Sequence, residues 1–268
     1  MLSAALLNTG MYAIIRFLAT AKAGLGDAYP RGVLLTLGFA SIIIGAAFMV
    51  RRGNFKRLFA YSSVEHMGII AVALGFGGIL GLYGALQHTL NHAIAKAVLF
   101  LTSGDIVLRY HTREADGVRG LLAAAPLTGG VLVLGSLAVL GSPPFGLFLS
   151  ELTIGRAGFA SASPVLPLLL LALLAIAFVA FARTTTSMAT GAAVHPGPGR
   201  AADHGTGEAA AATTTGAAPV VRQPYPDHVA LLAAVAPLVA GLAVVLILGL
   251  WIPGGLNTVI RHAIAVIS

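Results

Sequence analysis

The sequence predicts an all-α protein, a polytopic bundle of about eight transmembrane helices. Of its 268 residues, 57% are hydrophobic and only 9% are charged, whereas about 25% of residues are charged in ordinary soluble domains. The mean hydropathy is +0.92. Glycine, proline and charge clusters also divide the chain into apolar segments of about 20 residues, the length that crosses a bilayer. Together these observations exclude a soluble enzyme.

The apolar segments follow one another with short polar breaks between them. We expect helices near residues 2–20, 32–50, 58–79, 82–108, 121–140, 144–160, 164–187 and 228–251. Two of the breaks are rich in cations, namely 51–57 and 109–119. Because cytoplasmic loops are enriched in Lys and Arg, both are predicted on the cytoplasmic side, two helices apart. The net charge of +7 is therefore attributed to membrane orientation, and no nucleic-acid partner is expected.

Three regions are predicted along the chain. Residues 1–188 form the transmembrane bundle, 189–226 form a flexible low-complexity linker rich in Ala, Gly, Thr and Pro, and 227–268 form a C-terminal transmembrane helix and a short tail. The tail is expected to be amphipathic and to lie at the interface, where Trp251 suits the aromatic belt. His195 and His204 in the linker are too few to indicate a metal site, and none is predicted.

The fourth segment contains an ionisable strip, because His88, His92 and Lys96 follow one another at intervals of four residues. Residues four apart share a face of a helix. Ionisable groups at membrane depth usually mark an ion or proton path, and a buried lysine beside two histidines can accept and release a proton. The alternatives are a structural ion pair for Lys96 and a core histidine for His88. A zinc site is disfavoured because the third ligand and the Glu of His-Glu-x-x-His are missing.

A helix break is predicted at Pro143 and Pro144, which are flanked by glycines. Within a membrane such a break is tolerated only where protein or water satisfies the freed backbone groups, and transporters place ion sites there. Glu151 follows the break and is therefore a candidate proton-binding group, with a helix-capping or interfacial carboxylate as the alternative. For Glu65 and His66, near the cations Lys56 and Arg57, a salt-bridged helix start close to the surface is at least as plausible as a relay role.

The chain contains no cysteine, so it has no thiolate ligands for an iron–sulfur cluster. We expect no cofactor and no redox centre in this chain. Whether the protein is an enzyme stays open, because any electron transfer would take place in another subunit of an oxidoreductase complex.

Three motifs in order resemble one family, the antiporter-like membrane subunits of complex I, membrane-bound hydrogenases and multisubunit cation/proton antiporters. They are residues 56–68, 88–96 and 141–151. Glu65, before His66, and the string 142–151 are most similar to the hydrogenase 4 component F type. The resemblance implies a five-helix antiporter-like repeat with a broken helix, one of an inverted pair. It also implies a polar axis in which Lys96 is the central lysine, His88 and His92 connect it, Glu151 ends it and Lys56 lies between two half-channels.

Two departures from the family pattern bear on the function. Asn8 stands where many complex I subunits have a lysine, which argues against classical pumping through that half. The chain is also about half as long as typical members, so we interpret it as a C-terminal half with an incomplete first repeat. The resemblance implies a proton-translocating, non-redox subunit of a complex I-like (NADH-quinone oxidoreductase) or group 4 hydrogenase complex. Its partners would be other membrane and hydrophilic subunits, the lipid of the inner (cytoplasmic) membrane, and protons. A cation/proton antiporter subunit and an inert truncated remnant are the alternatives.

Overall fold

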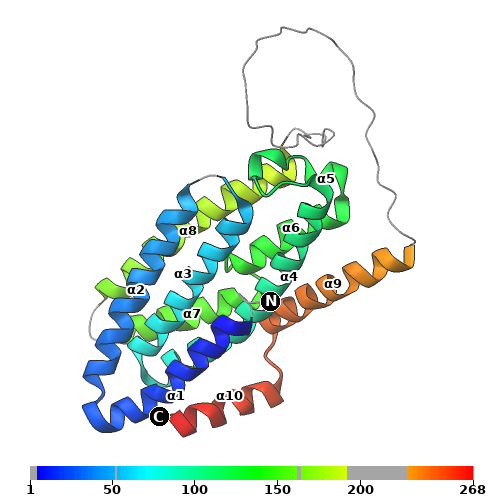
Figure 1. Cartoon of the computed structure of the whole chain (residues 1–268). Helices are drawn as coiled ribbons and strands as arrows, with labels where there is room; N and C mark the ends of the chain where they lie inside the picture. The colour runs from blue at the N-terminus through cyan, green and yellow to red at the C-terminus, as the bar shows by residue number, and fades with distance from the viewer. Residues whose placement is uncertain (1–4, 52, 162–163, 192–227, 268) are drawn as a thin grey trace, which may run out of the picture.

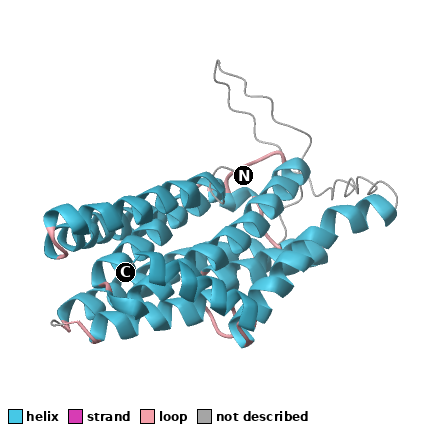
Figure 2. Cartoon of the chain, turned by 90° about the horizontal axis from the view of Figure 1, so that it is seen from below, coloured by secondary structure: helices cyan, strands magenta, loops and turns pink. Residues whose placement is uncertain are grey.

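The computed structural model describes residues 5–51, 53–161, 164–191 and 228–267. Within these ranges the chain is almost entirely helical, and its only strand-like pairing is an isolated bridge between Asn54 and Glu114. Figure 2 shows these helices joined by short loops. The predicted linker, including His195 and His204, lies largely outside the described residues.

Each of the eight predicted segments contains a helix (Figure 1). The helices are α1 (Leu7–Leu25), α2 (Ala28–Val50), α3 (Phe55–Phe76), α4 (Gly78–Tyr110), α5 (Leu121–Ala124), α6 (Pro126–Val139), α7 (Gly146–Phe159), α8 (Val165–Thr190), α9 (His228–Leu250) and α10 (Gly254–Ile267). Among the described residues, three helices, α2, α3 and α8, are long and apolar enough to cross a membrane singly, and α9 and α10 meet this criterion only as a pair, bent by 74°. The predicted all-α membrane bundle is confirmed.

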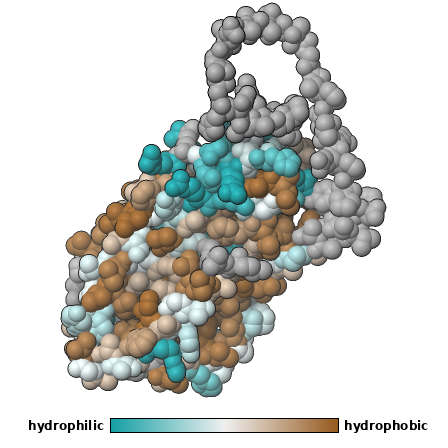
Figure 3. Space-filling view, in the orientation of Figure 1, coloured by the Kyte–Doolittle hydropathy of each residue, from teal (hydrophilic) through white to brown (hydrophobic). Residues whose placement is uncertain are grey.

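Polar and apolar surfaces separate along the bundle. In Figure 3 apolar residues cover most of its side, and hydrophilic residues gather at the end where α2 stops and α3 begins. The two cation-rich loops meet at this end, because Phe55 N donates to Arg113 O at 3.0 Å and Ala115 N donates to Gly53 O at 2.9 Å. Both loops therefore lie at the same end of the bundle, and their cytoplasmic location stays a prediction.

Helix α4 lies at the centre of the fold and packs against α3, α6, α7, α9 and α10. Helix α6 lies along the second half of α4, where Thr128 Oγ1 donates to Asp105 Oδ2 at 2.6 Å. Helix α7 lies along the first half, where Gly146 lies against Asn91 and Gly84 against Ile154. The two 14-residue helices therefore run end to end beside α4 and together cover the length of one crossing. Their break lies alongside the His92–Lys96 turn.

Two apolar clusters form the core, one at each end of the α3–α4 pair. One contains Phe55 and Phe59 of α3 with Ala95 to Ile106 of α4. The other contains Ile69 to Phe76 of α3 with Leu82 and Ala85 of α4. The part of both helices between these clusters carries the buried polar residues, so apolar packing encloses the site from both ends.

The tail after Trp251 folds as helix α10. Ile260 and Ile264 are buried in the second core cluster, whereas Val259 and Val266 are exposed. Tyr83 of α4 donates to Asn257 Oδ1 at 3.1 Å and fixes α10 beside the bundle. The tail therefore buries one face against the protein itself, which its amphipathic pattern permits.

Candidate functional site

The site is built on the antiparallel hairpin of α3 and α4. Helix α3 begins at an N-cap, Asn54, whose side chain accepts a hydrogen bond from Arg57 N at 3.1 Å. The hairpin turns at Gly77 and Gly78, both with positive φ, a conformation in which glycine has no steric penalty. A tight turn sets the register between the two helices, so residues far apart in sequence face each other at fixed levels.

Lys96 is fully buried and is held by α3. Its Nζ donates to Phe59 O at 3.1 Å and to Ser62 Oγ. The side chain of Glu65 lies on the same helix, one turn beyond Ser62, and is 5% exposed. No ion pair joins Lys96 to an acidic residue among the described ranges, so the structural ion pair considered from the sequence is not present. A buried amine held by neutral oxygens retains the ability to exchange a proton.

His66 of α3 lies between the two histidines of α4. Its Nδ1 is 3.0 Å from His88 Nε2, and its ring centroid is 5.1 Å from that of His92. All three rings are buried. The strip predicted on α4 is therefore continued on α3, because the antiparallel register brings His66 to the level of both α4 histidines.

Ser150 of α7 determines the proton arrangement of His88. The Ser150 hydroxyl donates to Leu147 O at 2.8 Å, so its oxygen is left to accept from His88 Nδ1 at 2.9 Å. A neutral imidazole with its proton on Nδ1 has a lone pair on Nε2, and this nitrogen faces His66. A hydrogen bond between the two rings then requires a proton on His66 Nδ1, which His66 carries as its Nδ1 tautomer or as the imidazolium.

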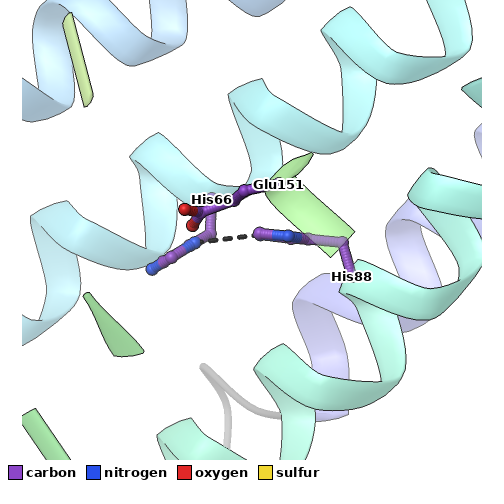
Figure 4. Close-up of side chains that lie close together, drawn as sticks. All are labelled: His66, His88 and Glu151. Carbon is purple, nitrogen blue, oxygen red and sulfur yellow. Dashed lines mark hydrogen bonds between the residues drawn. The ribbon is translucent and has the colours of Figure 1, made fainter. Parts of the chain in front are cut away.

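Glu151 lies just after the predicted break, which the structure contains between Val139 and Gly146. The Glu151 carboxylate lies over Gly141, where a β-carbon would overlap it, and Gly141 has a φ of +62°. Glu151 is half-buried. Figure 4 shows that its carboxylate, His66 and His88 point toward one another from α7, α3 and α4.

A cavity of about 600 Å³ opens beside this group. Ser62, Glu65, His66, Glu151 and Arg156 contribute to its polar lining, and apolar side chains of α7 and α8 and the break at Gly141–Pro143 form most of the remainder. The carboxylates of Glu65 and Glu151 and one histidine therefore border a single space between α3, α7 and α8.

Several buried polar atoms beside the site have no protein partner among the described residues. They are both ring nitrogens of His92, Gln87 Nε2 and Asn91 Oδ1. Buried polar groups in native proteins are nearly always hydrogen-bonded, and ordered water commonly supplies the partner. We therefore expect water next to His92, between the level of Lys96 and that of His66.

The structure brings together four of the five residues selected from the sequence. His88, His92, Lys96 and Glu151 surround one section of α3, whereas Lys56 is half-buried in the first turn of α3, at the polar end. Asn8 of α1 donates to Thr89 O of α4 at 3.2 Å. The role assigned to Lys56 stays a prediction.

Sequence reasoning did not select Ser62 or Ser150, and it left Glu65 and His66 open between a salt-bridged helix start near the surface and a relay role; the structure buries both side chains. Glu65 and His66 are 5% and 3% exposed. Counted from Asn54, they lie about 17 Å into the helix at 1.5 Å per residue. The asparagine cap was the signal that could have shown this depth.

Comparison with known proteins assigns a family to the part of the chain that contains the site. Residues 1–178 match the family model for the NADH:quinone oxidoreductase/Mrp antiporter transmembrane segment. The hydrogenase-4 component F homolog of Methylacidiphilum infernorum is 42% identical over 166 residues, which are 62% of this chain and 34% of that protein. The NAD(P)H-quinone oxidoreductase chain 4 1 of Synechococcus elongatus is 36% identical over 156 residues, which are 58% of this chain and 29% of that protein.

A solved structure supports the fold. A chain of the membrane-bound sulfane sulfur reductase, an archaeal respiratory membrane complex, superimposes with a TM-score of 0.78 at 23% identity, covering 100% of this chain and 49% of that one. The matched part of this chain spans about a third of the length of the Methylacidiphilum infernorum protein. With a family model matched over residues 1–178 and the same helical fold, the chain belongs to the NADH:quinone oxidoreductase/Mrp antiporter transmembrane family.

Proposed function

We propose that this chain is the proton-conducting part of a non-redox membrane subunit in a complex I-like or group 4 hydrogenase complex. One observation carries the proposal: buried Lys96, His92, His66 and His88 and half-buried Glu151 form a nearly continuous group of titratable side chains between two apolar clusters. Ionisable groups at membrane depth are costly and are typical of proton paths.

The geometry suggests how a proton moves along the group. Lys96 exchanges a proton through Ser62 or through water with His92. His92 and His66 lie ring to ring, and His66 contacts His88 directly. A proton that arrives on His66 at its other nitrogen releases the Nδ1 proton toward His88 or Glu151, because an imidazole binds one proton and releases another. Glu151 then exchanges the proton with the cavity.

Electrons would be supplied elsewhere in the complex, because the chain has no cysteine and hence no thiolate ligand for a cluster. Redox steps in partner subunits would change the charge near Lys96 and Glu151 and so drive the proton along the group. We accordingly propose partners among the membrane and hydrophilic subunits of such a complex, and a location in the inner (cytoplasmic) membrane.

Replacement of the central lysine tests the proposal. Lys96→Ala is expected to leave assembly intact and to abolish redox-driven proton pumping in inverted membrane vesicles. Lys22→Ala is the matched control, because Lys22 ends α1 and pairs with Asp27 at 3.4 Å, outside the buried group; it should pump normally. Wild-type pumping by Lys96→Ala would reject the proposal.

Cation/proton antiport is the second candidate. The freed backbone at a helix break can coordinate Na⁺, and here Glu65, Glu151 and the break at Gly141–Pro143 line one cavity. Proton flux that requires Na⁺ and stops when choline replaces it would favour this function. The absence of any flux from the wild-type protein would favour the inert remnant instead.

A further inference from the structure

His66, His88 and Glu151 have the geometry of a metal site as well as that of a relay. Each offers one ligand atom, and these three atoms lie within 4.8 Å of one another. They come from three different helices, α3, α4 and α7 (Figure 4). Both histidines are buried and the glutamate is half-buried, so the ligand atoms converge inside the bundle.

The spacing suits a small tetrahedral ion. With Zn–N bonds of about 2.0–2.1 Å, two ligands of a tetrahedral zinc ion are about 3.4 Å apart. His66 Nδ1 and His88 Nε2 are 3.0 Å apart, so a small rotation of either ring admits the ion. The glutamate side chain is long enough to bring its oxygen into bonding distance. Two imidazoles and one carboxylate favour Zn²⁺ over Mg²⁺ or Ca²⁺, which prefer oxygen ligands.

Ser150 already provides the supporting contact that such sites require. A metal-ligating histidine usually donates its second N–H to an oxygen, which fixes the ring and its tautomer. His88 Nδ1 has this contact with Ser150 Oγ at 2.9 Å, and Ser150 in turn donates to Leu147 O. The lone pair of His88 Nε2 is thereby directed at the point where the metal would bind.

The site also has an open side. His66 and Glu151 line the cavity of about 600 Å³, together with Glu65. A water molecule from this cavity would complete four-coordination, as in zinc sites with three protein ligands.

We propose that His66, His88 and Glu151 bind one Zn²⁺ ion, with water as the fourth ligand. Bound zinc would occupy the lone pairs through which His66 and His88 exchange protons, and would therefore block conduction. The inhibition of proton conduction by zinc rests on the proposed function, whereas zinc binding itself does not.

Zinc binding is measured by titrating the full chain in lipid nanodiscs with Zn²⁺ against a chromophoric chelator. His195→Ala/His204→Ala serves as the starting protein, because these two histidines could bind zinc adventitiously. We expect one zinc ion per chain. His88→Ala and Glu151→Gln should each weaken binding by about 100-fold, and Ser150→Ala by about 10–100-fold, the usual effect of losing a supporting contact.

His111→Ala is the matched control, since it removes a histidine at the end of the same helix without removing a ligand or a neighbour of one; its zinc affinity should stay within about twofold. Circular dichroism establishes that each variant is folded. X-ray absorption at the zinc edge can be measured on the starting protein without any further substitution, and it should show two imidazole ligands. Unchanged affinity in folded His88→Ala, or a zinc shell without imidazole, would overturn the proposal. If the protein binds zinc but conducts no protons, only the proposed function is rejected. If it conducts protons but binds no zinc, only the metal site is rejected.

Discussion

Ser150 provides the sharpest test of the histidine network, because it acts on the site without being titratable. Its hydroxyl donates to Leu147 O and accepts from His88 Nδ1, at 2.8 and 2.9 Å. In Ser150→Ala the buried Nδ1–H of His88 loses its partner. Leaving a buried donor unsatisfied costs about 1–3 kcal/mol, and 1.4 kcal/mol corresponds to a factor of about ten in an equilibrium constant.

We expect two consequences of Ser150→Ala. The free energy of unfolding should fall by about 1–3 kcal/mol. Proton flux should fall about tenfold or more, because His88 is no longer held with its Nε2 lone pair toward His66. Flux is measured in vesicles with a pH-sensitive dye, and stability by chemical denaturation in mixed micelles.

Thr153→Ala is the matched control for this test. Thr153 lies one turn further along α7, and its hydroxyl also donates to a backbone carbonyl, Leu149 O at 2.8 Å. Within the described ranges no hydrogen bond joins Thr153 to a histidine, so its loss should leave flux unchanged. Equal flux in Ser150→Ala and wild type, or an equal loss in Thr153→Ala, would refute the role given to Ser150.

Two further predictions concern the break and the α1–α2 corner. Gly141→Ala should destabilise the protein by at least about 1–2 kcal/mol, because alanine is strained at a φ of +62° and its β-carbon would displace the Glu151 carboxylate. Its control is Gly104→Ala in α4, which meets nothing within 4 Å and should be neutral or slightly stabilising in denaturant titrations. The hydrogen bond to Arg31 is the main cause that lowers the pKa of Asp27. Ionised Asp27 therefore adds to the free energy of unfolding above the usual aspartate pKa of about 3.9, and this stabilisation is lost as the pH falls through the lowered folded-state pKa. Melting temperatures of wild type and Asp27→Asn should differ slightly at neutral pH and converge in acid; a difference that grows in acid would contradict this.

Local patterns predicted much of the fold. Apolar length located the helices from α1 to α9, although α10 was expected only as an amphipathic tail, and paired prolines located the break between α6 and α7. The intervals of four residues placed His88, His92 and Lys96 on one face of α4, because the helical repeat is a local property. Helix ends were less accurate; α4, for example, runs from Gly78 to Tyr110, where 82–108 was expected.

Local sequence patterns could not predict every residue of the site, because several belong to it only through contacts between helices. His66 meets His88 only because the Gly77–Gly78 turn sets the register of α3 against α4. The depth of Glu65 follows from the cap at Asn54, which lies four residues before the predicted start of the helix. Ser150 resembles any other helical serine in the sequence, and its importance comes from α7 lying against α4. The residues that the sequence did not predict therefore belong to the site because of packing between helices that are distant in sequence.

The central claim is that protons pass through the buried histidines, and His66 tests it most directly because it contacts both His88 and His92. The measurement is the rate of redox-driven proton pumping by vesicles that carry His66→Ala in the assembled complex, with His111→Ala, at the end of α4, as control. The account predicts loss of pumping in His66→Ala and a normal rate in His111→Ala. A wild-type rate in a correctly assembled His66→Ala complex would contradict it.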